Sequence, residues 1–262
     1  METLEFEVDQ RGVATLTLAR PEKHNALSGT MIAELRALAD SLQTKTDLRA
    51  VVLRGGGKSF CAGGDLNWMR AQFEADRATK AREARALAEM LFAMNALPQP
   101  LIGAVQGNAF GGGLGLMCVC DTVVSIESAK FGLTETKLGL IPATIGPYVL
   151  ARMGGGPARR VFMSSRLFGA QDALNLGLVH RVETVSSFEA GVAAEVVPYL
   201  SCAPGAVAEA KALTRSLGYA PTQEDIDVSI EALIARWESA EAQEGVAAFF
   251  EQRATPWAAK KG

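Results

Sequence analysis

The 262-residue sequence predicts an α/β fold, because short β-type runs alternate with helical segments in its first half and helices dominate the rest. The runs 50–53, 101–105 and 122–126 are apolar and rich in β-branched residues, and a segment with helical spacing of apolar residues precedes each of them. Each helix has to cover a sheet face, so this alternation favours layers of strands and helices. Hydrophobic residues make up 48% of the chain, enough for a substantial core.

The N-terminal region is expected to begin with a hairpin. Residues 4–8 and 13–18 are β-type runs around the turn-prone Gln10-Arg11-Gly12. The first helix is expected after an N-cap at Ser28 or Thr30. Further helices are expected at 79–96, which ends at Pro98-Gln99-Pro100, and from 112 to about 120.

The chain after Ile145 is expected to be mainly helical. Seven helices are predicted there, at 145–153, 157–164, 170–176, 187–200, 206–217, 222–237 and 241–252. The segment Cys202-Ala203-Pro204-Gly205 is the best candidate for a joint between two parts of the chain, 1–201 and 202–262.

Composition and charge exclude several classes of function. The formal net charge of −3 and the pI near 5.6 leave no basic footprint for nucleic acid. The first ten residues contain four acidic side chains and no positively charged signal region, and no apolar stretch is long enough for a membrane span. Four cysteines, Cys61, Cys118, Cys120 and Cys202, are too few and too irregularly spaced for a disulfide framework. We expect free thiols and a cytoplasmic protein that binds neither nucleic acid nor membrane.

Common cofactor and metal motifs are not found in the sequence. The segment 55–59, Gly-Gly-Gly-Lys-Ser, lacks the first glycine of a P-loop, because Val52 stands there. Neither glycine triplet, 111–113 or 154–156, extends to G-x-G-x-x-G. Cys118 and Cys120 have no second cysteine pair for a metal. We therefore expect neither a metal ion nor a nucleotide cofactor.

Two glycine clusters each follow a strand and precede a helix. They are 60–66, Phe-Cys-Ala-Gly-Gly-Asp-Leu, and 107–113, Gly-Asn-Ala-Phe-Gly-Gly-Gly. Either one alone could be a tight turn. Glycine lets a ligand approach the main chain, however, and a helix N-terminus offers unpaired N–H groups. Two such segments that meet at one oxygen would make an oxyanion hole.

With the motifs around these clusters, the chain resembles the crotonase (enoyl-CoA hydratase/isomerase) superfamily. The motifs follow one another in the family order, namely Arg20-Pro21-Glu22-Lys23-His24-Asn25-Ala26-Leu27, the two glycine clusters, Asp121, 131–142, 169–179 and 248–253. The resemblance implies a spiral of ββα turns, with the CoA and active site in 1–201. It also implies a helical region, 202–262, that forms a trimer or a dimer of trimers.

The resemblance assigns roles to individual residues. The N–H groups of Gly64 and Gly112 would bind the thioester oxygen of an acyl-CoA substrate, which needs no further cofactor. The CoA moiety would lie along the loop with Lys23 and His24 and along a second segment, residues Ala62, Gly63, Asp65 and Leu66. From the residues alone, Lys23 and His24 are equally well explained as solvated loop residues.

The acid–base residue of the predicted site is Glu135. Hydratases of this family typically carry a second glutamate two residues after the glycine triplet, where this chain has Gly115. If Gly115 leaves room for a bound water or for the acyl group, a glutamate at that position should alter acyl preference or obstruct turnover. Apolar neighbours of Glu135 would bury it and raise its pKa towards neutrality.

Finer resemblance favours a glutaconyl-type substrate. The segments 65–69, 141–149 and 158–160 are similar to bacterial methylglutaconyl-CoA and isohexenylglutaconyl-CoA hydratases. Arg70, Lys137 and Arg152 are candidate partners for the distal carboxylate of such a substrate. We expect hydration of a short or branched 2-enoyl-CoA. A Δ3,Δ2-enoyl-CoA isomerase and a non-catalytic acyl-CoA-binding protein remain alternatives.

Overall fold

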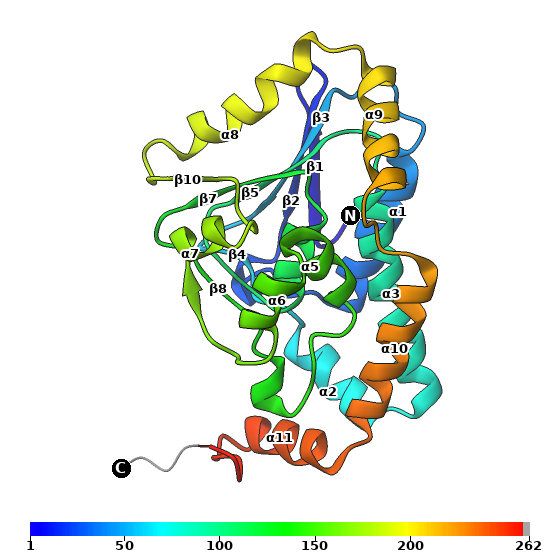
Figure 1. Cartoon of the computed structure of the whole chain (residues 1–262), viewed down its shortest axis with the longest axis vertical. Helices are drawn as coiled ribbons and strands as arrows, with labels where there is room; N and C mark the ends of the chain where they lie inside the picture. The colour runs from blue at the N-terminus through cyan, green and yellow to red at the C-terminus, as the bar shows by residue number, and fades with distance from the viewer. Residues whose placement is uncertain (259–262) are drawn as a thin grey trace.

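A computed structural model describes residues 1–258, so the end of the predicted helical region, 259–262, lies outside the described residues. The strands form two sheets (Figure 1). The six-stranded sheet contains, in order across the sheet, β1 (Leu4–Val8), β2 (Val13–Leu18), β3 (Ala50–Gly55), β5 (Leu101–Val105), β7 (Thr122–Ile126) and β10 (Arg181–Glu183). The four-stranded sheet contains β4 (Ser59–Cys61), β6 (Asn108–Phe110), β8 (Lys130–Gly132) and β9 (Phe168–Gly169).

The chain alternates between the two sheets as a spiral. Strands β3, β5 and β7 lie side by side and parallel in the first sheet, and each is followed by a strand of the second sheet, β4, β6 or β8. A helical segment separates β4 from β5, and another separates β6 from β7. This arrangement confirms the predicted spiral of ββα turns. All five residues of β5 are buried, as expected for a parallel strand that is covered on both faces.

Close approach of the backbone explains one glycine between the sheets. A Cβ at Gly107, in the turn between β5 and β6, would lie 2.1 Å from the Lys58 carbonyl oxygen in the turn between β3 and β4. Only glycine permits these two turns to stack. The stacking brings successive spiral turns, and the glycine clusters that follow them, into contact.

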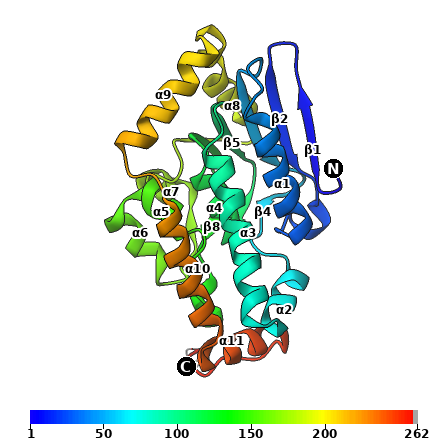
Figure 2. The same ribbon diagram turned by 90° about the vertical axis from the view of Figure 1, so that its right-hand side faces the viewer.

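Helices cover the spiral and enclose the site. They are α1 (Gly29–Leu42), α2 (Leu66–Glu74), α3 (Arg77–Asn95), α4 (Gly112–Cys118), α5 (Gly146–Met153), α6 (Gly155–Phe162), α7 (Ala170–Asn175), α8 (Phe188–Val196), α9 (Pro204–Leu217), α10 (Gln223–Trp237) and α11 (Ala240–Phe250), with 3-10 turns η1 (Pro21–Lys23), η2 (Glu135–Leu138) and η3 (Val197–Ser201). Figure 2 shows α3 with α1 on one side and α10 on the other. The Ser28 hydroxyl accepts a hydrogen bond from the Met31 N–H at 3.2 Å, which confirms Ser28 as the N-cap of α1.

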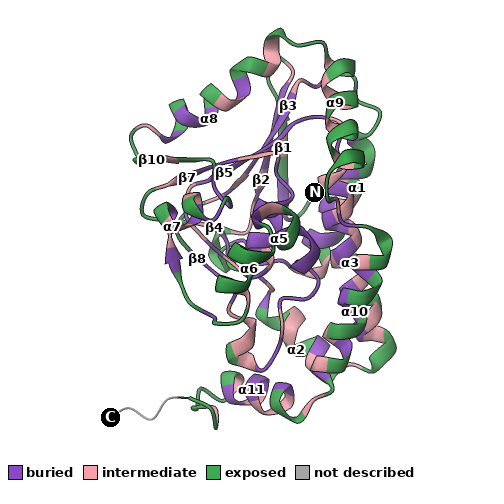
Figure 3. Ribbon diagram, in the orientation of Figure 1, coloured by how far each residue is buried: buried purple, intermediate pink, exposed green. Residues whose placement is uncertain are grey.

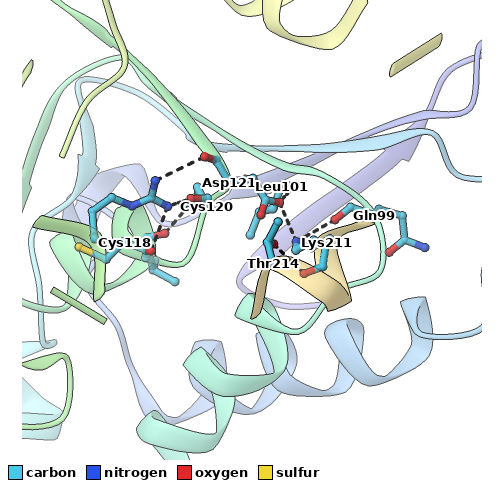
Figure 4. A network of polar contacts seen from close by, with 9 residues as sticks. Gln99, Leu101, Cys118, Cys120, Asp121, Lys211 and Thr214 are labelled. Atoms are coloured by element: carbon cyan, nitrogen blue, oxygen red, sulfur yellow. Dashed lines mark hydrogen bonds and ion pairs between the residues drawn. The ribbon is translucent and has the colours of Figure 1, made fainter. Parts of the chain in front are cut away.

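Helix α9 stands away from the body of the protein. None of its residues is buried (Figure 3). Its Lys211 ammonium lies 2.6 Å from the Asp121 carboxylate and donates to the Gln99 carbonyl (Figure 4). Because the same Asp121 oxygen accepts from the Leu101 N–H at 2.7 Å, Asp121 joins α9 to the start of β5. Asp121, which was noted in the sequence as a motif residue, has a structural role here.

The structure confirms most of the predicted elements and adds others. Helix α2 and the short strands β4, β6, β8, β9 and β10 were not predicted. The expected helix 187–200 ends as an α-helix at Val196, because Pro198 has no N–H to continue it. All four cysteines are free. Within residues 1–258 no single helix is long and apolar enough to cross a membrane; only the pair 188–201 and 204–217, bent by 109°, meets that length and composition together.

Candidate active site

One pocket lies between the spiral and the helices that cover it. Its walls come from α2, α3 and α10, which meet in the lower half of Figure 1, and from the segment 140–145. Gly64, Gly112 and Glu135 all line it, so the structure brings together the three residues predicted to act on the substrate. Leu87, Leu140 and other apolar side chains line most of the remaining surface.

The two glycine clusters lie against each other in this pocket. Gly63 has a φ of +94°, and a Cβ there would lie 3.0 Å from the Phe110 carbonyl oxygen and 3.7 Å from the Gly112 nitrogen. A Cβ at Gly111 or Gly112 would in turn lie 3.9 Å from the Gly63 Cα. Glycine is needed at position 63, where φ is positive and a Cβ would be tight against the Phe110 carbonyl, whereas the 3.9 Å distances show that the two segments lie in van der Waals contact.

The N–H groups of Gly64 and Gly112 are free to bind a ligand. Gly112 is the first residue of α4, so its N–H has no intrahelical acceptor. Leu27 forms a bridge with the other cluster through the Gly63 carbonyl and the Asp65 N–H, which leaves the Gly64 N–H unused. Within residues 1–258, neither of the two N–H groups donates to a protein acceptor. Two unpaired donors on adjacent segments can stabilise one developing oxyanion.

The Glu135 carboxylate lies beside these donors. A Cβ at Gly111 would lie 3.0 Å from its Oε1, so the glycine triplet also makes room for the carboxylate. The Oε2 atom is buried and has no hydrogen-bond partner among the described residues. Burial raises the pKa of the Glu135 carboxyl to about 7, although its own backbone N–H opposes the shift. A carboxyl with this pKa can both accept and donate a proton near neutral pH.

The space beside Gly115 is occupied by an apolar side chain. A Cβ at Gly115 would lie 2.5 Å from the Ile145 Cγ2 and 3.6 Å from the Leu91 Cδ1. Ile145 is 3% exposed and lines the pocket. An apolar side chain therefore occupies the space that a side chain at position 115 would need.

Comparison with known proteins shows the family to which the chain belongs. The enoyl-CoA hydratase/isomerase family model matches residues 8–260. The chain belongs to the enoyl-CoA hydratase/isomerase family. It is 33% identical over 222 residues to the enoyl-CoA hydratase ACTT6 of Alternaria alternata, covering 84% of this chain and 72% of that protein.

Solved structures of enoyl-CoA hydratases share the fold over nearly the whole chain. One from Shewanella pealeana is 38% identical, with a TM-score of 0.79 and coverage of 97% of this chain and 96% of that one. One from Mycobacterium avium is 28% identical, with a TM-score of 0.87 and coverage of 98% and 99%. The crotonase-like spiral with its C-terminal helices is thus shown for this family member.

The two segments expected to hold CoA lie next to each other in this hydratase/isomerase. The Ala62 N–H donates to the His24 carbonyl at 3.0 Å. Lys23, His24, Ala62 and Leu66 are exposed, whereas Gly63 is buried. The His24 Nδ1 lies 3.0 Å from the Ser59 hydroxyl, so its ring is partly positioned by the protein. None of these four exposed residues lines the pocket of Glu135, which places them outside its walls.

A buried asparagine shapes the first of these segments. Asn25 has a φ of +53° and is fully buried. Its amide group donates to the carbonyls of Gly56 and Ser59, each at 2.8 Å, and its oxygen accepts from the Arg20 N–H at 3.0 Å. These bonds hold the loop against the stacked turns and present Lys23 and His24 at the surface.

The Asp65 side chain has a structural role in the fold. The residue is 6% exposed, and its carboxylate pairs with Arg20 at 3.0 Å and caps α2 by accepting from the N–H groups of Asn67 and Trp68. Burial raises the pKa of Asp65, but the Arg20 and backbone hydrogen bonds outweigh it and lower the pKa overall. The carboxylate is fully engaged in the fold, the Asp65 N–H donates to the Leu27 carbonyl, and its carbonyl accepts from the Met69 N–H, so the role of Asp65 in CoA binding stays a prediction.

None of the three basic residues suggested for a distal carboxylate lines the pocket. The Arg152 guanidinium donates to the carbonyls of Cys118, Cys120 and Asp121 at the end of α4. The Arg70 guanidinium lies over the Phe250 ring, 4.5 Å from its centroid, and Lys137 is exposed on η2.

A different basic residue, Lys80, lines the pocket and is buried. The sequence contained a signal for it that was not used. Lys80 shares one face of its helix with Ala84 and Leu87, at a spacing of i, i+4 and i+7. A lysine on an otherwise apolar face of a helix is unusual, because lysine is rarely buried.

Proposed function

We propose that this enzyme adds water to a short or branched 2-enoyl-CoA, with a glutaconyl-type acyl group favoured. The observation that supports it most is the buried, unpartnered Glu135 Oε2 in the same pocket as the free N–H groups of Gly64 and Gly112. Thioester activation requires donors at the carbonyl oxygen, and proton transfer requires a carboxyl with a pKa near the working pH. The glutaconyl preference is supported by the similarity of segments 65–69, 141–149 and 158–160 to hydratases of such substrates.

The reaction can proceed with a single carboxyl group. Glu135, ionised, takes a proton from water as the oxygen bonds to carbon 3 of the substrate. The electron pair of the double bond moves to the thioester oxygen, where the N–H groups of Gly64 and Gly112 stabilise the enolate. Glu135 then returns the proton to carbon 2, which completes the 3-hydroxyacyl-CoA. The addition of water involves no net oxidation or reduction, so the proposed reaction needs no redox cofactor.

A Δ3,Δ2-enoyl-CoA isomerase is the second candidate. Ile145 places an apolar side chain where a second acid would need space, beside Gly115. In isomerisation, Glu135 would remove a proton from carbon 2 of a 3-enoyl-CoA and return it to carbon 4, through the same stabilised enolate. This reaction needs one carboxyl and no water.

Turnover assays separate the candidates. Purified protein would be given 2-enoyl-CoA, glutaconyl-CoA and 3-enoyl-CoA thioesters while the absorbance of the conjugated double bond is followed. Loss of that absorbance with 2-enoyl substrates, together with formation of a 3-hydroxyacyl-CoA, supports hydration. Gain of absorbance from the 3-enoyl substrate without a hydroxylated product supports isomerisation. Binding without turnover across the panel would contradict both reactions.

We also propose that the protein assembles as a trimer or a dimer of trimers. Helix α9 has no buried residue, and its Leu213 and Leu217 side chains are 57% and 80% exposed. Burial of these exposed apolar side chains against a neighbouring subunit would be energetically favourable.

A further inference from the structure

Helix α11 packs directly on η2, the 3-10 turn that begins with Glu135. A Cβ at Gly245 of α11 would lie 2.4 Å from the Leu138 carbonyl oxygen. A Cβ at Gly139, where η2 ends with a φ of +69°, would lie 2.5 Å from the Glu241 carbonyl oxygen of α11. Glycine on both sides therefore permits a contact between two backbones that larger residues would push apart.

Hydrogen bonds hold other carbonyl groups at the end of η2. The Arg236 guanidinium of α10 donates to the Gly139 carbonyl and pairs with Glu241 at the start of α11. The Trp257 indole, beyond the end of α11, donates to the Lys137 carbonyl at 3.3 Å. Residues from α10, α11 and the segment after α11 thus contact consecutive carbonyl groups of a single turn.

The Glu135 carboxylate takes its position from this turn. Its Oε2 has no hydrogen-bond partner among the described residues, and the donor that acts on the carboxyl is its own backbone N–H. Among the charged side chains on the elements around it, Lys80 of α3 lines the same pocket, whereas Arg236 and Glu241 pair with each other. Because its own backbone holds the carboxylate, a movement of η2 would move the acid.

From these contacts we infer that Arg236, Gly245 and Trp257 are positioning residues, which hold the acid of the reaction beside the two backbone donors and shield it from water. This role rests on the proposed function, because Glu135 is taken as the group that transfers the proton. A general acid–base has to lie within hydrogen-bonding reach of the reacting atom, so a shift of about 1 Å in η2 should slow turnover. The C-terminal helices would then take part in the chemistry as well as in assembly.

Two variants disturb these contacts in different ways. Gly245→Ala places a Cβ against η2, and Arg236→Met removes the donor to the Gly139 carbonyl. Each should lower kcat at least about tenfold on a 2-enoyl-CoA and leave KM within about threefold, because the backbone donors to the thioester are unchanged. The matched controls are Gly156→Ala, where a Cβ has open space, and Arg77→Met, which removes two ion pairs with α10; neither should change kcat.

The pH dependence of kcat/KM separates positioning from a general loss of stability. Burial raises the pKa of the Glu135 carboxyl to about 7, so kcat/KM should rise with pH through this value as the base ionises. A displaced η2 admits water to the carboxyl and lowers its pKa, so the acidic limb should move down by at least about half a pH unit in both variants. Wild-type kcat in both folded variants, or a lower kcat with the limb unmoved, would overturn the positioning role.

Unfolding measurements test the same role without turnover. At pH 8 the ionised, buried Glu135 destabilises the protein, so Glu135→Gln should raise its Tm. This gain should be smaller by at least about a third in the Arg236→Met background. Trp257→Phe, which keeps a ring and removes only the indole N–H, should reduce the gain in the same direction and serves if the other variants do not fold.

An equal gain in Tm from Glu135→Gln in every folded background would also contradict the positioning role. Failure of the proposed function looks different. The wild-type enzyme would then turn over neither 2-enoyl nor 3-enoyl thioesters, while the differences in Tm between the backgrounds would persist.

Discussion

Replacing Glu135 with glutamine should abolish most activity and stabilise the protein at alkaline pH. Glutamine would keep the shape of the side chain but cannot transfer a proton, so kcat should fall about 10²- to 10⁴-fold, with binding of the thioester largely retained. At about 1.36 kcal/mol per factor of ten, this loss corresponds to roughly 3–5 kcal/mol of transition-state stabilisation.

The effect on stability follows from the buried carboxyl. Its pKa is about 7 in the folded protein against an ordinary value of 4.5, so the folded state binds the proton more tightly than the unfolded state. This contribution to stability is fully present below pH 4.5 and is lost as the pH rises through 7. Ionisation of the Glu135 carboxyl in the folded protein then lowers the free energy of unfolding by roughly 3 kcal/mol. The neutral glutamine does not incur this cost at pH 8.

Thermal unfolding and steady-state kinetics test both effects on the same samples. The Tm of Glu135→Gln should exceed that of the wild-type protein by roughly 5–10 °C at pH 8, and the difference should shrink towards pH 4.5. Glu127→Gln, at an exposed glutamate, is the matched control and should show neither change. A Glu135→Gln enzyme with more than about a tenth of the wild-type kcat, or with no gain in Tm at pH 8, would refute the role of the buried acid.

Three further predictions concern the donors, the packing and the assembly. Gly112→Pro removes an oxyanion donor at a helix position that tolerates proline, so kcat should fall about 10²-fold or more. Gly112→Ala is the control, because its Cβ makes the same contact with Leu27 while the N–H is kept. Equal kcat values for the two folded variants would exclude this donor. Gly115→Ala should lower the free energy of unfolding by about 1–3 kcal/mol, because its Cβ would contact Ile145. Adding Ile145→Leu to this variant removes the contacting Cγ2 and should restore part of that loss in chemical denaturation. A double variant no more stable than Gly115→Ala would contradict this packing. Light scattering at micromolar concentration should give the mass of a trimer or hexamer, and a monomer mass would count against assembly through α9.

Local patterns in the sequence were sufficient for most of the fold. The apolar runs at 101–105 and 122–126 are strands with the predicted bounds, because buried parallel strands are nearly continuous apolar segments. Helix α1 begins after its predicted N-cap, since capping depends on residues within one turn. Helix α2 was not predicted, because its residues have few buried positions and its cap at Asp65 lies within a glycine cluster.

The residue types of the site could be predicted from the sequence, but their surroundings could not. Glycines at 63–64 and 111–113 and a glutamate at 135 indicated backbone donors and an acid, since these roles depend on the residue itself. Whether Gly115 borders open space depended on Ile145, thirty residues later, and only the folded chain placed a side chain there. Lys80 was overlooked and Arg152 was overvalued for the same physical reason. The sequence shows that a residue is charged but not what surrounds it: Lys80 lines the pocket and is 9% exposed, whereas Arg152 donates to carbonyl groups at the end of α4.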